Sequence, residues 1–248
     1  MSKISIPQAS QYTEGKENTG MIEIPACFPG YGTTLGNAIR RVLLSSIEGA
    51  AITSVKIKGV PHEFSAIDGV MEDVVQIILN LKQVRFRMHS DEKMTATLSV
   101  KGEKVVTSGD IKTSADLEIV DGSQHIATLT DKKSALEMEF TVEKGIGYVP
   151  SDQNEEEKEV GSIVIDAVYT PVKRVNYNVE NMRVGKRTDY EKVTLEIVTD
   201  GSITPQEAFD KSVDILVEQF NAISSGGGVS DVTDIETTDV EEVEEENK

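Results

Sequence analysis

The order of hydrophobic periodicities along the chain constrains its fold more than any other feature. Apolar residues recur at helical spacing near the start, at about 34–46 and 69–82, and again near the end, at about 205–223. Between them the pattern alternates as in strands, most cleanly at 136–143, where four apolar residues alternate with three glutamates and a threonine. This order predicts an α+β protein in which a β-rich domain interrupts a domain of helices packed on a sheet, built from both ends of the chain.

The last predicted helix carries the most specific local signal. Thr204-Pro205-Gln206-Glu207 forms a capping box with proline at the first helical position. Behind it the apolar residues cover more than one face, because Ala208, Ile215 and Ala222 flank the main stripe. We therefore expect this helix to contact more than its own core.

The first predicted helix, which we expect Thr33 or Thr34 to cap, combines Gly36 with two adjacent arginines, Arg40 and Arg41. Glycine inside a helix costs roughly 1 kcal/mol relative to alanine, so it needs a reason in packing. The pattern predicts an interface helix that packs closely on a partner at Gly36. Its arginine guanidinium groups would donate hydrogen bonds to carboxylates or carbonyls.

The composition excludes several classes of protein. With 248 residues the chain is long enough to bury a core. Its one cysteine, Cys27, excludes an internal disulfide and any zinc or iron–sulfur site built on cysteines. No apolar run approaches the roughly 20 residues that cross a bilayer, and the N-terminus lacks a secretion pattern. We expect a cytoplasmic protein without membrane contact.

Charge is unevenly distributed along the chain. The formal net charge is −18, of which 231–248 contributes −8. This excess argues against direct binding of DNA or RNA, which depends mainly on phosphate contacts. A glycine-rich stretch precedes the acidic end, so 225–248 is predicted to be a disordered linker and tail, and the acidic run at 152–159 an exposed loop. By contrast 172–187 carries +4, which predicts that it faces a partner.

No catalytic, metal or cofactor motif emerges from the residues. His62, His89 and His125 are scattered, and none has metal-ligand spacing with another. Gly30-Tyr31-Gly32 before a helix is similar to a dinucleotide-binding turn, but the third glycine, Gly36, comes one place late and no P-loop lysine follows. We expect these glycines to form a turn and a close packing contact. A phosphate-binding enzyme using this turn remains a minor alternative.

Several long motifs are more specific than any of these patterns. In chain order they are Gly30 to Ser46, Gly59-Val60-Pro61-His62-Glu63-Phe64-Ser65, Gly69-Val70-Met71-Glu72-Asp73-Val74, Leu79-Asn80-Leu81-Lys82, Gly147-Tyr148-Val149-Pro150, Asp166 to Val172, Val175 to Glu180, Thr188-Asp189-Tyr190 and Thr199 to Pro205. Through these motifs, over roughly residues 20–223, the chain closely resembles the bacterial RNA polymerase alpha subunit.

The resemblance implies a non-catalytic subunit of a nucleotidyltransferase complex. It would homodimerise and serve as the assembly platform for the beta and beta-prime subunits in transcription, with no cofactor or metal. The implied dimerisation domain combines 1–48 with 172–224, and the inserted β-rich domain spans 49–171. The alternative function is an acidic interaction adaptor or nucleic-acid mimic outside the polymerase core, which would act through the acidic tail.

The resemblance also implies three groups of contact residues. The dimerisation contacts are Leu35, Ile39, Leu43, Phe209, Val213, Leu216 and Phe220. The beta-subunit contacts are Arg40, Arg41, Leu44, His62, Glu63, Phe64 and Ser65. The beta-prime contacts are Lys82, Ile165 and Arg183.

The chain departs from the family pattern in two places. Ala26-Cys27-Phe28-Pro29 stands where the family usually has proline, leucine, glutamate and arginine. The family also normally continues into a helical module that binds promoter DNA, whereas only 25 residues follow Ile223 here. We therefore expect this chain alone not to bind promoter DNA.

Overall fold

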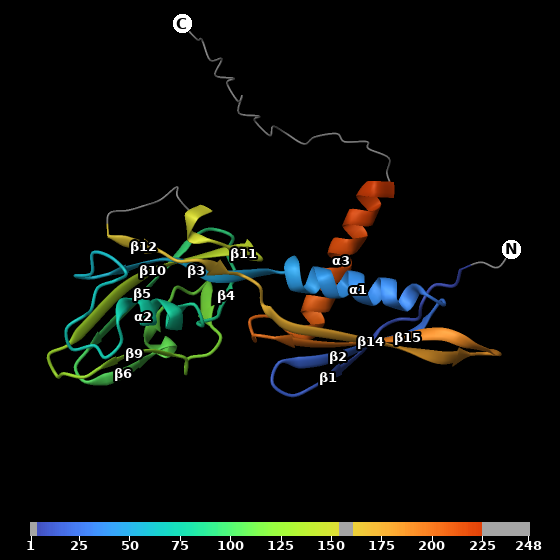
Figure 1. Cartoon of the computed structure of the whole chain (residues 1–248), viewed down its shortest axis with the longest axis horizontal. Coiled ribbons are helices and arrows are strands. Elements are labelled where there is room, and N and C mark those ends of the chain that lie inside the picture. Colours follow the sequence, from blue (N-terminus) through green and yellow to red (C-terminus); the bar gives the residue numbers. More distant parts are fainter. Residues whose placement is uncertain (1–3, 154–160, 225–248) are drawn as a thin grey trace, which may run out of the picture.

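The computed structural model describes residues 4–153 and 161–224, and it divides into two units that lie side by side along the long axis (Figure 1). One unit, here the terminal unit, is built from the two ends of the described chain. The other, the insert unit, is built from the middle. The predicted linker and tail at 225–248 lie outside the described residues, as does most of the predicted loop at 152–159.

In the terminal unit, two helices cover one face of an antiparallel sheet. Over the described residues the sheet has four strands, in the order β1-β2-β15-β14. The elements are β1 (Gln11–Glu14), β2 (Thr19–Cys27), α1 (Tyr31–Ser45), β14 (Val172–Val184), β15 (Arg187–Thr199) and α3 (Pro205–Ser224). Both helices pack on the sheet and on each other, and they share a core with it that includes Ile22, Leu43, Leu195 and Phe209. The outer half of α3 extends beyond this core (Figure 1).

The insert unit is mostly sheet with one α-helix among its described residues. Its main sheet runs β7-β5-β10-β3-β4-β8, with β12 also paired to β3. The strands of this sheet are β3 (Glu48–Ile57), β4 (Phe86–Met88), β5 (Met94–Lys101), β7 (Ile111–Lys112), β8 (Leu117–Ile119), β10 (Ala135–Ile146) and β12 (Ser162–Val164). Two smaller ladders pair β6 (Lys104–Thr107) with β9 (His125–Leu129) and β11 (Tyr148–Val149) with β13 (Ala167–Val168). The helix α2 (Val74–Leu81) packs its inner face into the core of this unit.

The α+β class and the interrupted order of elements are confirmed. The alternation at 136–143 lies within β10, where its four apolar residues are buried. The capping box of α3 is also confirmed, because the backbone NH of Glu207 donates to Thr204 Oγ1 and that of Thr204 to the Glu207 carboxylate.

Two predicted helix boundaries were wrong. The first helix begins at Tyr31, and its N-cap is Gly30 rather than a threonine. The second begins at Val74 rather than near Gly69, because Gly69 has a φ of +73° and Val70 forms a β-bridge with Leu129. These conformations are not helical, so the helix starts only after Asp73, whose carboxylate accepts from the NH of Gln76.

Two arginines of the insert unit hold the two units together. Arg85 donates to the carbonyl of Val168 at 3.0 Å and lies 3.5 Å from the carboxylate of Asp200, whose side chain is only 3% exposed. Arg87 donates to the carbonyls of Gly201 and Ser202, just before α3. The start of α3 is therefore tied to the edge of the insert unit.

The capping box gives a stability prediction with an internal control. Thr204→Ala removes the hydroxyl that accepts from Glu207, so we expect it to lower the free energy of unfolding by about 1 kcal/mol in urea titrations. Thr33→Ala should have little effect, because α1 has no side-chain cap and Thr33 is exposed. Equal losses in the two variants would contradict this assignment of the caps.

Candidate protein-interaction surfaces

The Gly30-Tyr31-Gly32 turn does hold an anion, and that anion is a carboxylate of the same chain. Gly30 has a φ of +86°, and its NH donates to Glu191 Oε1 at 2.9 Å. The NH of Gly32 donates to Glu191 Oε2 at 2.8 Å. Glu191 of β15 thus caps the positive end of α1 from across the sheet. These two NH groups are unavailable to a phosphate, which argues against the phosphate-binding alternative.

Gly36 of α1 packs closely on the sheet of its own chain. The expectation that it packs on a partner is corrected accordingly. A Cβ at Gly36 would lie 2.7 Å from the ring of Tyr177 on β14. One turn later, Arg40 Nε donates to the carbonyl of Val175, also on β14. The missing side chain at Gly36 therefore lets the helix approach the strand.

Of the three α1 residues expected at the beta contact, Arg41 is the most available. It is exposed, and its guanidinium makes no hydrogen bond or ion pair with any residue that the structure describes. Arg40 is half-buried and already engaged with Val175, and Leu44 is half-buried against the terminal core. An approaching carboxylate would therefore meet Arg41 first.

The residues expected at the dimer contact divide by burial. Ile39, Leu43 and Phe209 are at most 6% exposed in the core of their own chain, and their place at the dimer contact stays a prediction. Leu35, Val213 and Leu216 are half-buried at the margin of that core, and Phe220 is 62% exposed. All seven follow the helical periodicity of α1 and α3, which does not distinguish a core residue from a contact residue.

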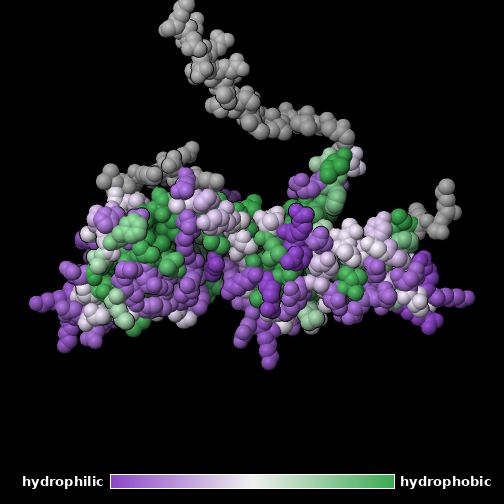
Figure 2. All heavy atoms as spheres, in the orientation of Figure 1, coloured by the Kyte–Doolittle hydropathy of each residue, from purple (hydrophilic) through white to green (hydrophobic). Residues whose placement is uncertain are grey.

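The outer half of α3 exposes an apolar surface. Only one of its residues, Phe220, was among the residues expected at the dimer contact. Val217, Phe220 and Ile223 are all more than half exposed. Figure 2 shows hydrophobic atoms gathered at this end of the helix, beyond the body of the molecule. Val217 and Ile223 could have been added to the expected dimer contact from the sequence, because both follow the helical apolar spacing of this segment.

The other residues expected at the beta contact lie in the loop before α2. Phe64 is 81% exposed, and His62 is exposed with its Nδ1 3.2 Å from Ser65 Oγ. The carbonyl of Ser65 accepts from the NH of Val74, which fixes the loop against the start of α2. The backbone around Phe64 is thus held in place, while its ring is exposed.

This loop and Arg41 do not form one cluster. α1 leads into one end of β3, and the loop follows the other end of that strand. The ten residues of β3 between them span roughly 30 Å at a rise of about 3.3 Å per residue. A single partner that contacts both must therefore be at least as long as β3.

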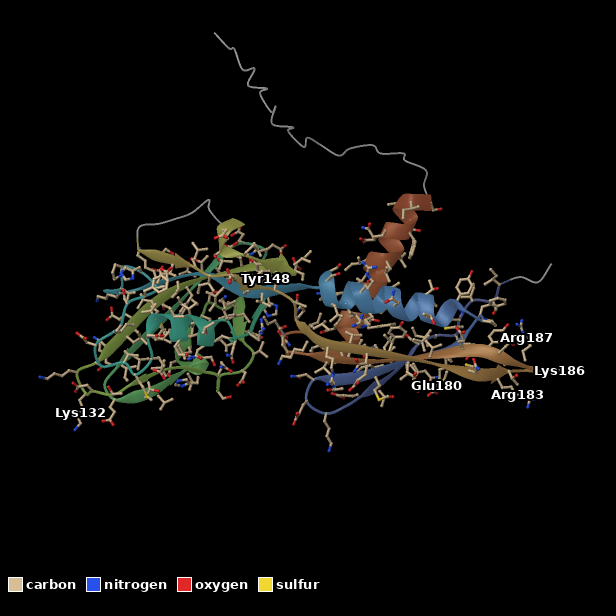
Figure 3. All side chains as sticks on the ribbon, viewed as in Figure 1. Lys132, Tyr148, Glu180, Arg183, Lys186 and Arg187 are labelled. Carbon is tan, nitrogen blue, oxygen red and sulfur yellow. The ribbon has the colours of Figure 1, made fainter. Side chains whose placement is uncertain are left out.

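The three residues expected at the beta-prime contact are not brought together either. Lys82 Nζ pairs with Asp166 Oδ2 at 2.8 Å in the insert unit, and this hydrogen bond holds the pKa of Asp166 well below its usual range, helped by the NH of Ser151. Ile165 is 2% exposed in the insert core, and its place at the beta-prime contact stays a prediction. Arg183 lies at the opposite end of the molecule from the insert unit (Figure 3).

The basic stretch at 172–187 ends in the hairpin that joins β14 to β15. Arg183, Lys186 and Arg187 project from its tip (Figure 3). Part of this charge is already paired, because Arg187 makes a bidentate contact with Asp189. The same guanidinium stacks on the ring of Phe28, which stands at the first departure from the family pattern. Phe28 thus packs into an aromatic and cationic cluster where the family usually has a charged residue.

Neither a metal site nor a membrane span is found in the described residues. His125 pairs with Glu72, His89 lies 3.7 Å from Glu118, and His62 contacts Ser65, so the three histidines are apart. Within 4–153 and 161–224 no group of three or more histidine, cysteine, aspartate or glutamate side chains could hold a metal ion. No helix in these ranges is long and apolar enough to cross a membrane.

The cap supplied by Glu191 is testable by stability. Glu191→Ala leaves two backbone NH groups of α1 without a charged acceptor, so we expect a loss of about 2 kcal/mol in the free energy of unfolding. Glu180→Ala removes an exposed carboxylate from the neighbouring strand and should cost less than about 0.5 kcal/mol. A Glu191→Ala chain as stable as the Glu180→Ala chain would show that the cap does not hold α1.

Comparison with known proteins shows the family of the chain. Residues 55–170 match the model of the RNA polymerase Rpb3/RpoA insert domain, which coincides with most of the insert unit. Relatives named DNA-directed RNA polymerase subunit alpha occur in Symbiobacterium thermophilum (51% identical over 88% of this chain), Geobacter metallireducens (55% over 77%) and Desulforamulus reducens (46% over 100%). The chain covers 69%, 56% and 78% of the lengths of these three relatives. Identity at this level over most of the chain shows that it belongs to the family of bacterial DNA-directed RNA polymerase alpha subunits.

Proposed function

We propose that this chain is a non-catalytic alpha subunit that homodimerises and serves as the assembly platform for the beta and beta-prime subunits of RNA polymerase. The observation that carries the proposal is the similarity to alpha subunits over almost the whole chain, at 51% identity across 88% of it. One protomer of the dimer would bind beta and the other beta-prime. The chain would then act on DNA only through the enzyme it helps to assemble.

The separation into two cores supports a division of labour within the chain. The core of the terminal unit draws on residues 22–47 and 172–209, and that of the insert unit on 50–165. We propose that 1–48 with 172–224 form the dimerisation domain and that 49–171 form the inserted domain. No observation favours the alternative of an acidic adaptor or nucleic-acid mimic, whose tail lies outside the described residues.

The outer half of α3 is the proposed centre of the dimer contact. Val217, Phe220 and Ile223 continue the half-buried margin formed by Val213 and Leu216. Three large apolar side chains that protrude on a helix are costly in water, and burial stabilises by roughly 25 cal/mol per Å². A two-fold axis would bury the same patch on both copies at once.

Light scattering tests the dimer. The wild-type chain should have twice its 27.1 kDa mass at micromolar concentration. Phe220→Ser/Ile223→Ser should be monomeric, because it replaces the most exposed apolar side chains of α3 with polar ones. Val105→Ser, at another exposed apolar residue in the insert unit, should remain dimeric. A strictly monomeric wild-type chain would overturn the dimer.

Arg41 is the proposed anchor for beta. We expect Arg41→Glu to abolish co-purification of a co-expressed, tagged beta subunit while the dimer persists, since the exposed guanidinium has no role within the described chain. Lys132→Glu, at an exposed cation on the outer edge of the insert unit, should bind beta normally (Figure 3). If Arg41→Glu bound beta as well as Lys132→Glu, the assignment of Arg41 would be wrong.

A further inference from the structure

A small polar cavity lies at the junction of the two units. Its volume is about 130 Å³, which is room for a few water molecules or one small oxyanion. Residues of β3, β4 and β10 in the insert unit line it, together with Ser202 and Lys211 at the start of α3. A ligand in this cavity would therefore contact both units.

Positive charge gathers around this cavity in a chain whose formal net charge is −18. The described residues that line it include three cations, Arg87 of β4, Lys144 of β10 and Lys211 of α3. Glu48, at the beginning of β3, is the one carboxylate in the same described lining. Three cations against one carboxylate attract an anion, and the walls of a cavity strengthen the attraction because they displace water.

Each of the three cations keeps hydrogen-bond donors for a ligand. Lys211 is exposed and forms no hydrogen bond or ion pair with any residue that the structure describes. Arg87 uses Nε and Nη2 on the two carbonyls that precede α3, which leaves the NH groups of Nη1. Lys144 contacts Asp91, whose side chain is 91% exposed, and an ammonium group has two further donors. The cavity is thus lined by donors without enough acceptors.

Arg87 and Lys211 lie close to each other although they belong to different units. Hydrogen bonds from Thr204 hold the pKa of Glu207 below its usual range, and the positive charges of both Arg87 and Lys211 lower this pKa further. The two cations therefore act on one carboxylate. That carboxylate already accepts from the backbone NH of Thr204 in the capping box. A single ligand could contact both cations at once.

The proposed dimer contact leaves this cavity open. Lys211 and Phe220 are nine residues apart in α3, which is about two and a half helical turns. They consequently project from opposite sides of the helix. A second copy that packs on Phe220 would not cover Lys211.

We propose that Arg87, Lys144 and Lys211 form a binding site for a phosphate group, which would link α3 to the insert unit. A tetrahedral phosphate offers three or more oxygens and can accept from all three cations, whereas a carboxylate offers only two. Free phosphate and the end of a longer phosphate chain share this chemistry. The proposal goes beyond the assembly function and does not depend on it.

Isothermal titration calorimetry of the whole chain tests the site, with inorganic phosphate and separately with pyrophosphate, at constant ionic strength. Wild type should bind one ligand saturably. Lys211→Gln should weaken binding about tenfold, because it removes a charge-assisted hydrogen bond. Lys132→Gln, at an exposed lysine away from the cavity, is the matched control and should bind like wild type. Glu48→Gln should bind several-fold more tightly, because it removes the opposing carboxylate.

The two ligands distinguish the sources of the phosphate group. Tighter binding of pyrophosphate that also depends on Lys211 would assign the site to a phosphate chain, and tighter binding of phosphate would assign it to the free ion. Absence of saturable binding of either ligand by wild type would overturn the proposal. So would equal affinities of Lys211→Gln and Lys132→Gln. If Lys211→Gln proved unfolded by circular dichroism, Glu48→Gln would decide, because unchanged or weaker binding by that chain would place the ligand outside the cavity.

Discussion

The carboxylate of Glu191 ties the start of α1 to the sheet, and the arrangement of the terminal unit depends on this contact. Two backbone NH groups of the glycine turn converge on one side chain of β15. Gly36 then lets the helix lie directly on Tyr177, and Arg40 fastens the next turn to Val175. With its first three turns held in this way, the helix presents Arg41 to solvent and carries the chain into β3. The geometry of one cap thereby sets the position of a surface residue almost three turns away.

The second constraint is the length of β3. This strand passes from the terminal unit into the insert unit and separates Arg41 from the Phe64 loop. A single partner that contacted both would have to extend along this strand. The junction is also firm, since Arg85 and Arg87 bind the connections that lead into β14 and α3. A partner that spans both units would therefore meet a surface whose two parts are already placed.

Much of the fold could be predicted from the sequence, because periodicity and capping chemistry are local. The alternation at 136–143 and the capping box at Thr204 were confirmed for this reason. The start of α1 was missed because its cap comes from Glu191, a residue 161 positions from Gly30. The start of α2 was missed because Gly69 and Val70 are held by contacts with β9 and its flanks. Long-range contacts of this kind leave no local signal.

The interaction residues were harder to predict than the fold. Ile39, Leu43, Phe209 and Ile165 were assigned to contacts through the family resemblance, and their burial places them in the cores. Arg41 and Phe64, inferred from the same resemblance, are exposed as a contact requires, and no local pattern indicates that β3 lies between them.

The mass of the assembled complex tests the account most directly. Native mass spectrometry of this chain co-expressed with beta and beta-prime should give two copies of the 27.1 kDa chain for one copy of each large subunit. A complex containing one copy, or large subunits that associate fully without this chain, would contradict the role of a dimeric assembly platform.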